Sequence, residues 1–229
     1  MTIKVFDLCG ANDLRFSPNC WRTRMAVAHK ELTANFVPWL FNEKEAISFS
    51  GGKTVPVLVD QDTTIRGSWE IANYLEENYP DAPSLFGGEA GRAVTGFINA
   101  WADSTLHPGL IRCILPDVFD RIDDTDKNYF RESREKRFGM TIEEMRESQP
   151  QALANFNRAL TPLRTILKSE EWMAGDTPAY ADYIIFGAFQ WARVTSPLQI
   201  VNADDPIHPW RERMLDLFDE LGRGFPAAS

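Results

Sequence analysis

Four consecutive residues, Ser17-Pro18-Asn19-Cys20, are the first candidates for chemistry, because they stand where a strand pattern gives way to a helical one. Ser17 followed by proline is typical of a helix N-terminus, where a hydroxyl can donate a hydrogen bond to a thiolate that a ligand brings. The helix dipole would add to that effect. A plain helix cap is the alternative role for Ser17. Cys20 fits either a small core residue or one half of a dithiol pair whose attacking cysteine is replaced by serine.

A second group of candidates lies between residues 53 and 68. A cis bond at Val55-Pro56 would turn the Val55 backbone outward to pair with an extended peptide, whereas a trans proline would mark a plain edge strand. Ser68 begins a helical pattern, so it either caps that helix or stands beside N–H groups that can hold a carboxylate. Lys53 fits a contact with a second carboxylate or a solvated loop position.

The elements that must position these residues follow from the apolar periodicity. Strands are expected at residues 3–8, 35–40, 55–60 and 63–65, with helices beginning at Ser17 and Ser68. The order is β-α-β-β-β-α, or β-α-β-α-β-β-α with one more helix, which is the order of a thioredoxin-like domain. In that fold the chemistry lies where the first strand meets the first helix, here between Cys9 and Arg22.

Helical periodicity replaces the strand pattern in the second half of the chain. Apolar stripes at helical spacing cover residues 93–101, 153–167, 184–192 and 210–221. Thr141 with Glu144 predicts a capping box, and Pro162 predicts a kink or a break. The Pro- and Gly-rich stretch before residue 89 follows neither period. We therefore expect an α/β domain over residues 1–80, a linker over 81–90 and an all-helical bundle over 91–229.

The composition of the chain limits the classes of partner that we expect. The 24 basic and 33 acidic residues give a net charge of −9, which argues against nucleic acid. No apolar run approaches the ~20 residues that cross a membrane, and the start lacks a signal-peptide block, so we expect a cytoplasmic protein without a membrane partner. The three cysteines and three histidines have no metal-ligand or disulfide-framework spacing, so we expect neither a metal nor a structural disulfide.

Over its whole length the chain resembles the glutathione transferases. The matching pieces are Ser17-Pro18, Val55-Pro56-Val57-Leu58, Gly67-Ser68 with Ile71-Ala72 and Tyr74-Leu75, and Gly175-Asp176 with Ala181-Asp182. Within that superfamily it is most similar to the bacterial and fungal β-etherase-type group. The segments that carry this closer likeness are 17–24, Ser68-Trp69, Ile111-Arg112-Cys113 and Ser133-Arg134-Glu135.

The resemblance implies a detoxifying transferase that takes glutathione as co-substrate, works without a metal and forms a homodimer through the linker and the first helix of the bundle. It implies that Ser17 stabilises the glutathione thiolate and that Ser68 holds the γ-glutamyl carboxylate. Lys53, Val55 and a cis Pro56 would complete the glutathione site. Two positions depart from the family pattern: Gly67 stands where many relatives have an acidic residue, and Ala179 where the buried helix usually begins with Ser or Thr.

The second substrate is expected to be a hydrophobic, aromatic electrophile lying against the helical domain, near Phe16, Trp39, Trp101 and His107. Glutathione-dependent ether cleavage is a further activity that the resemblance implies. His107 fits either a general acid or a structural residue. Two other function classes stay open: a non-catalytic carrier of glutathione and apolar ligands, and a glutathione-dependent thiol–disulfide reductase that uses Cys9 or Cys20.

Overall fold

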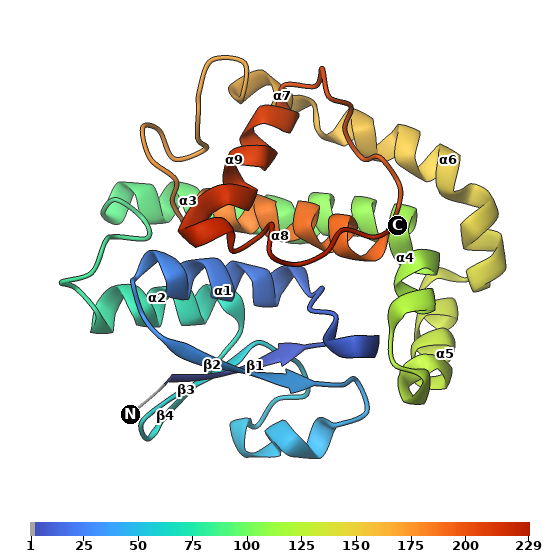
Figure 1. The fold of residues 1–229 in the computed structure, drawn as a ribbon, viewed down its shortest axis with the longest axis horizontal. Coiled ribbons are helices and arrows are strands. Elements are labelled where there is room, and N and C mark those ends of the chain that lie inside the picture. Colours follow the sequence, from blue (N-terminus) through green and yellow to red (C-terminus); the bar gives the residue numbers. More distant parts are fainter. Residues whose placement is uncertain (1–2) are drawn as a thin grey trace.

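A mixed four-stranded sheet forms one side of the molecule and helices form the rest (Figure 1). The computed structural model describes residues 3–229; Met1 and Thr2, the start of the expected first domain, lie outside the described residues. The strand order is β2-β1-β3-β4, in which β1 and β2 are parallel and the other pairs are antiparallel. The strands are β1 (Ile3–Leu8), β2 (Ala34–Trp39), β3 (Val57–Asp60) and β4 (Thr63–Arg66). The predicted thioredoxin-like sheet is confirmed.

Helices α1 (Pro18–His29) and α2 (Ser68–Asn78) cover the face of the sheet that is turned toward the helical half of the chain (Figure 1). A 3₁₀ helix, Lys44–Ser50, stands between β2 and β3, where the longer of the two expected element orders has a helix. A second 3₁₀ turn, Ala11–Asp13, leads from β1 toward α1. The junction of β1 with α1, residues 9–17, therefore lies at one end of the sheet.

The remaining chain is helical, as the sequence predicts. Its helices are α3 (Glu89–Trp101), a π-helical turn (Ala102–Leu106), α4 (His107–Arg121), a 3₁₀ turn (Asp124–Asp126), α5 (Lys127–Phe138), α6 (Ile142–Ala159), α7 (Thr161–Ile166), α8 (Tyr180–Thr195) and α9 (Ile207–Glu220). The capping box at Thr141 and the break at Pro162 are both confirmed, since α7 restarts with that proline in its first turn. The expected linker lies between α2 and α3, apart from its last two residues, which begin α3.

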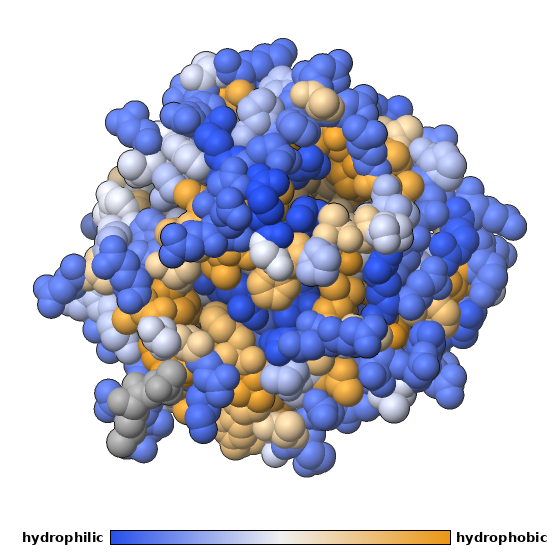
Figure 2. All heavy atoms as spheres, in the orientation of Figure 1, coloured by the Kyte–Doolittle hydropathy of each residue, from blue (hydrophilic) through white to orange (hydrophobic). Residues whose placement is uncertain are grey.

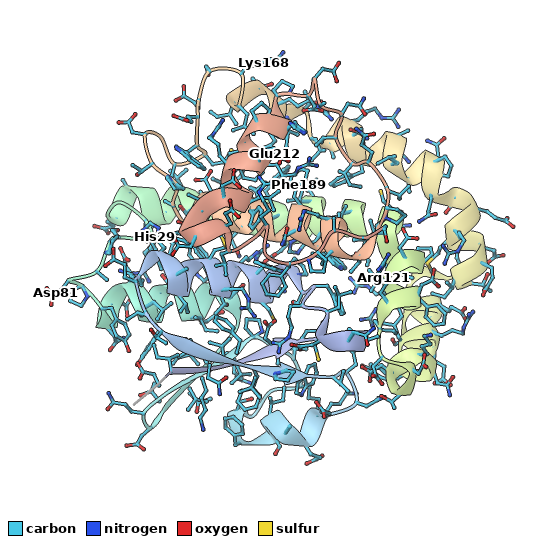
Figure 3. All side chains as sticks on the ribbon, in the orientation of Figure 1. His29, Asp81, Arg121, Lys168, Phe189 and Glu212 are labelled. Atoms are coloured by element: carbon cyan, nitrogen blue, oxygen red, sulfur yellow. The ribbon has the colours of Figure 1, made fainter. Side chains whose placement is uncertain are left out.

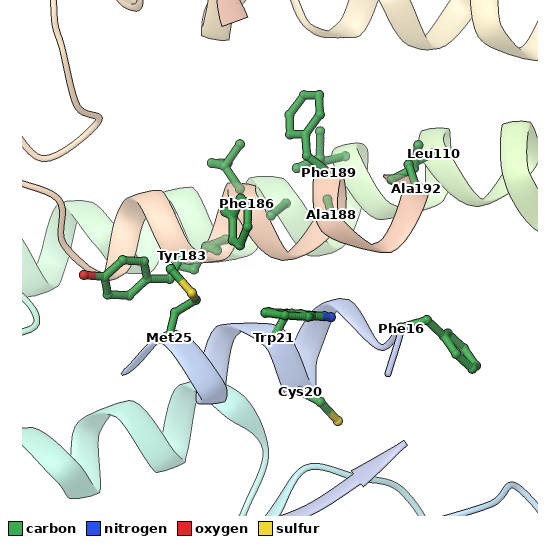
Figure 4. Packing of buried hydrophobic residues seen from close by; sticks show 14 of the residues in the cluster. Phe16, Cys20, Trp21, Met25, Leu110, Tyr183, Phe186, Ala188, Phe189 and Ala192 are labelled. Carbon is green, nitrogen blue, oxygen red and sulfur yellow. The ribbon is translucent and has the colours of Figure 1, made fainter. Parts of the chain in front are cut away.

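Helix α8 is the centre of the core and packs on α1 (Figure 4). Trp21 on α1 meets Phe186 on α8 edge to face, with 6.1 Å between ring centroids. A side chain at Gly187 would collide with the carbonyl oxygen of Pro18, so the two backbones approach closely at the first turn of α1. At the other end of α1, His29 bonds to Ser84 O at 3.0 Å and to Tyr183 Oη at 2.5 Å (Figure 3). Both ends of α1 are therefore held against the helical half.

Asp182 fixes the start of α8. Its carboxylate accepts hydrogen bonds from the backbone N–H groups of Ala179 and Met173 and from the indole N–H of Trp210, at 3.1, 2.8 and 2.8 Å. The residue at the cap position is Ala179, which has no oxygen to contribute. Asp182 therefore supplies the side-chain part of this cap, and Ala179 supplies none.

Polar residues cover most of the face drawn in Figure 2, with apolar patches between them. Among residues 3–229, no helix has both the length and the apolar content needed to cross a membrane.

Candidate functional site

Ser17 is placed by the first turn of α1. Its Oγ accepts a hydrogen bond from the backbone N–H of Cys20 at 3.3 Å, and Pro18 is the first helical residue, so the predicted cap is confirmed. That bond uses a lone pair of Oγ and leaves the hydroxyl hydrogen to be donated. The side chain is buried yet faces a cleft, which is where a directed donor can act on a bound group.

This first cleft, the aromatic cleft, has a volume of about 340 Å³. Its apolar wall consists of Leu8, Phe16, Pro18, Phe41, Pro108, Ile111, Val118, Phe130 and Trp191. Its polar lining consists of Ser17, Asn19, Asp103, His107, Arg134 and Arg137. An apolar cavity of this size with a few convergent polar groups is typical of a site for a small organic molecule.

A second cleft of about 280 Å³, the polar cleft, lies beside the first. It is lined by Asn19, Arg22, Thr54, Val55, Gly67, Ser68, Trp69, Glu70, Asn99 and Asp103. Asn19 and Asp103 line both clefts, so the two form one continuous site with Ser17 near their junction. A ligand that spans both clefts would have its polar end in the polar cleft and its reactive end near Ser17.

The peptide bond between Val55 and Pro56 is cis, as the resemblance implies. Pro56 is buried, and its carbonyl accepts the N–H of Gly67 at 3.0 Å. Within residues 3–229, neither the N–H nor the C=O of Val55 has a backbone partner, although this residue lines the polar cleft. Lys53 is exposed and lies outside the lining of both clefts.

Ser68 lies in the polar cleft, but its predicted role as N-cap of α2 is wrong. Gly67 takes the cap position with a φ of 88°, and Ser68 is the first helical residue without a side-chain capping bond. The positive φ explains the shift, because glycine adopts it without steric cost. The first-turn N–H groups of Ser68, Trp69 and Glu70 have no backbone partner in the part of the chain that the structure describes. They remain available to an anion.

Arg22 is the main site residue that sequence reasoning missed. Its guanidinium is 1% exposed and donates to Asn99 Oδ1 and Asp103 Oδ1, both at 2.9 Å, with His107 Nε2 at 3.2 Å. Its Nε has no partner among the described residues, and Arg22 lines the polar cleft. The sequence offers no clear signal for this role, because α1 carries a second arginine, Arg24, two positions further on. The partners of Arg22 come from the helical half of the chain, which the local sequence around it cannot reveal.

His107 is held in its neutral form. Burial, and secondly the charge of Arg22, lower the pKa of His107 to about 3. Arg22 must donate to Nε2, because guanidinium has no acceptor, so the ring proton is on Nδ1. A histidine in this state is not a cationic general acid near neutral pH.

The four residues expected around the second substrate fall into two groups. Phe16 and His107 line the aromatic cleft with Ser17. Trp39 is buried and donates its indole N–H to Glu43 O at 2.7 Å, outside the lining of that cleft. Trp101 lines a separate apolar groove between α3 and α7. The structure therefore brings two of the four residues together with Ser17.

The cysteines are not arranged for dithiol chemistry. Cys9, Cys20 and Cys113 are buried free thiols. Burial raises the pKa of Cys9 to about 11 and that of Cys113 to about 12, and raises the pKa of Cys20 well above its ordinary value. A thiol–disulfide reductase needs a thiolate near neutral pH, so the raised pKa values of these thiols disfavour the reductase alternative. The described residues contain no group of three or more His, Cys, Asp or Glu that could hold a metal ion.

Comparison with known proteins gives matches over both halves of the chain. Residues 12–83 match the glutathione S-transferase N-terminal domain, and residues 93–210 match the glutathione S-transferase C-terminal domain. A curated relative, the glutathione S-transferase-like protein ustS of Aspergillus flavus, is 28% identical over 139 residues, which are 55% of this chain and 49% of that protein. The chain thus matches about half the length of this relative.

Several solved structures share the fold of this chain. A glutathione S-transferase of Ceriporiopsis subvermispora, solved in complex with glutathione, has a TM-score of 0.79 at 21% identity, covering 96% of this chain and 97% of that one. Glutathione transferase GSTFuA3 of Phanerochaete chrysosporium has a TM-score of 0.77 at 22% identity, covering 100% and 99%. Since the second domain match covers more than half of the chain, the protein belongs to the glutathione S-transferase family.

Proposed function

We propose that the protein is a glutathione transferase in which the Ser17 hydroxyl stabilises the glutathione thiolate. The observation that carries this proposal is the position of Ser17, at the N-terminus of α1 and near the junction of the aromatic and polar clefts. A free thiol has a pKa of about 8.5, so only a few per cent is thiolate near neutral pH. One directed O–H donor and the positive end of α1 both favour the anion.

The polar cleft suits the zwitterionic γ-glutamyl end of glutathione. The Ser68 side chain and the free N–H groups at the start of α2 are donors for its carboxylate. Glu70 supplies a carboxylate for its ammonium group. A Cβ on Gly67 would collide with Glu70 Oε2. The Glu70 carboxylate therefore occupies the space in front of Gly67, the position at which many relatives have an acidic residue. Glu70 thereby compensates for Gly67.

The remaining peptide would pair with Val55, whose backbone groups are free, and its glycyl carboxylate would reach Lys53 at the rim. The thiol then points toward Ser17 and the aromatic cleft. The thiolate attacks an electrophilic carbon held against Phe16: a C–S bond forms, the bond to the leaving group breaks with its electron pair, and the thiol proton has already passed to solvent.

A β-etherase-type activity is the narrower form of this proposal. It is supported by the likeness of residues 17–24 to that group and by the aromatic lining of the cleft. In an aryl ether the leaving group is an alkoxide or phenoxide, which takes its proton from water. Neutral His107, whose Nε2 already accepts from Arg22, would donate one hydrogen bond through Nδ1 and leave the proton balance to solvent.

A homodimer through α3 also belongs to this proposal. Val94 and Phe97 on α3 are 62% and 73% exposed, and Ile166 on α7 is 38% exposed, so one apolar groove faces outward. Exposed contiguous apolar surface of this kind marks interfaces, and the occupant we propose is a second copy of the chain. Sedimentation of the wild type and of Phe97→Glu tests it: a dimer that becomes monomeric supports the proposal, and a monomeric wild type contradicts it.

Turnover with glutathione tests the function itself. An activated aryl halide, an organic hydroperoxide and an aryl ether should be compared, and we expect turnover of the aryl halide, with ether cleavage if the narrower proposal holds. Glutathione binding without turnover of any of the three would instead favour the carrier. Activity of this type would suit a cytoplasmic protein of detoxification.

A further inference from the structure

Two arginines stand in the wall of the aromatic cleft without a counter-ion. Arg134 and Arg137, both on α5, line the cleft together with Phe41 and Phe130. Within residues 3–229, neither arginine forms an ion pair. Arg131 on the same helix shows the contrast, since it is paired with Glu135 and Glu143 at 2.9 Å each. The cleft therefore carries a local positive charge on a chain whose net charge is −9.

The Arg134 guanidinium is held in place by aromatic rings. Its Cζ lies 4.6 Å from the ring centroid of Phe130 and 5.6 Å from that of Phe41. Among the described residues it makes one side-chain hydrogen bond, from Nη1 to Ser133 Oγ at 2.9 Å. Burial, together with the charge of Arg137, lowers the pKa of Arg134, which shows that the surroundings offer the cation too little compensation. A partly desolvated cation of this kind gains from a bound anion.

The carboxylates near the cleft are already engaged. Asp103, in the lining, is paired with Arg22 at 2.9 Å. Asp126 accepts the backbone N–H groups of Phe41 and Asn42, both at 2.9 Å. The side chains that face Arg134 most directly are aromatic. At this end of the cleft, the carboxylates of the described residues therefore do not neutralise the charge of Arg134.

The aromatic wall links Ser17 to the two arginines. Phe16, the neighbour of Ser17, is 6.3 Å from Phe41 between ring centroids, and Phe41 is 5.7 Å from Phe130, over which Arg134 lies. A flat ring lying along this wall would have one end near Ser17 and the other near the guanidinium groups.

We infer that the second substrate is an anionic aryl electrophile, with a carboxylate or sulfonate held by Arg134 and Arg137 and its reacting carbon turned toward Ser17. The inference rests on the proposed function, and it names the substrate class of the same site. The guanidinium fork matches the two oxygens of a carboxylate.

The test compares 4-chloro-3,5-dinitrobenzoate with its methyl ester, which share ring, nitro groups and chloride leaving group. Because the ester group also activates the ring more strongly than the carboxylate, each kcat/KM with glutathione is divided by the rate constant of the uncatalysed reaction of the same compound. We expect this ratio to be about tenfold higher for the acid, a difference of about 1.4 kcal/mol, and the preference to be lost in Arg134→Gln and Arg137→Gln. The preference should also fall with added salt. Lys136→Gln is the matched control, because it removes an exposed charge from α5 outside the cleft lining.

An equal ratio of catalysed to uncatalysed rate for acid and ester in the wild type, or an acid preference that survives in both arginine variants, would overturn the inference. Absence of turnover with either compound would count against the proposed function alone. Calorimetric binding of 3,5-dinitrobenzoate and of its methyl ester then decides the inference by itself. A preference for the acid that disappears in Arg137→Gln supports the anion site, and equal binding contradicts it.

Discussion

The guanidinium of Arg22 on α1 donates to the carboxylate of Asp103 in the π-helical turn after α3, with 2.9 Å between Nη2 and Oδ1. Asp103 lines both clefts, and Ser17 caps the helix that carries Arg22. The ion pair therefore connects α1, which carries Ser17, to the helical half of the chain, at the point where the two substrates meet in the proposed function.

Replacing Arg22 by Met should lower both stability and glutathione affinity. The change removes the donor for Asn99, Asp103 and His107, and we expect the free energy of unfolding to fall by about 2 kcal/mol, since Asp103 itself keeps contact with solvent. Urea unfolding measures this. Arg92→Met is the control, because the Arg92–Glu77 pair is exposed on both sides and should contribute less than about 1 kcal/mol. Equal losses in the two variants would refute the structural role of Arg22.

Replacing Glu70 by Gln should weaken glutathione binding with little effect on kcat. The carboxylate in front of Gly67 is our candidate partner of the γ-glutamyl ammonium, so its loss should raise the KM for glutathione severalfold, in line with about 1 kcal/mol for one charge-assisted hydrogen bond. Steady-state kinetics at varied glutathione test this. Glu77→Gln on the same helix, outside the cleft lining, should leave KM unchanged. A KM for Glu70→Gln equal to that of wild type would remove this residue from the site.

At pH values below the ordinary pKa of histidine, His107 should make the free energy of unfolding depend on pH. Its folded-state pKa of about 3 lies below the value of about 6.5 in the unfolded chain, so between these values the unfolded state binds the extra proton. The free energy of unfolding should therefore fall as pH drops from 6.5 toward 3, by up to about 1.4 kcal/mol per unit. In His107→Gln this component should vanish. Parallel pH curves for wild type and variant would show that the histidine is not held neutral.

Replacing Ala179 by Ser should stabilise the protein. Ala179 has the extended backbone of a helix cap but no side-chain oxygen. A serine there could accept the N–H of Ala181, which has no backbone partner among the described residues, whereas that of Asp182 already donates to Ala179 O at 2.9 Å. We expect a gain of about 1 kcal/mol in the free energy of unfolding. Ala154→Ser, at an exposed position inside α6, should instead be neutral or slightly destabilising. A loss of stability in Ala179→Ser would show that the cap geometry does not admit the hydroxyl.

The parts of the site that sequence reasoning could predict are those with local signals. Ser17 is followed by a proline that fits the first turn of a helix, and Ser68 begins an apolar helical stripe. The cap of α2 was misplaced by one residue, since a glycine with positive φ leaves no side-chain pattern that distinguishes it from the serine beside it.

Contacts between distant segments could not be predicted. Arg22 and Asp103 are 81 positions apart, and their pairing depends on how α1 packs against α3 and α8. Trp39 and Trp101 have the residue type of a binding wall, yet one is buried against its own loop and the other faces a different groove. Arg134 belongs to a charged run typical of a solvated helix, and only the fold shows that its guanidinium faces a cleft.

The most direct test of the proposed chemistry is the pKa of the glutathione thiol in the binary complex, followed by thiolate absorbance across pH in the wild type and in Ser17→Ala. We expect a value clearly below the free value of about 8.5 in the wild type and a rise of at least about one unit in the variant, equivalent to about 1.4 kcal/mol. Thr54→Ala, at an exposed position in the polar cleft, should leave the thiol pKa at the wild-type value. An unchanged thiol pKa in Ser17→Ala, with glutathione still bound, would contradict the role of Ser17.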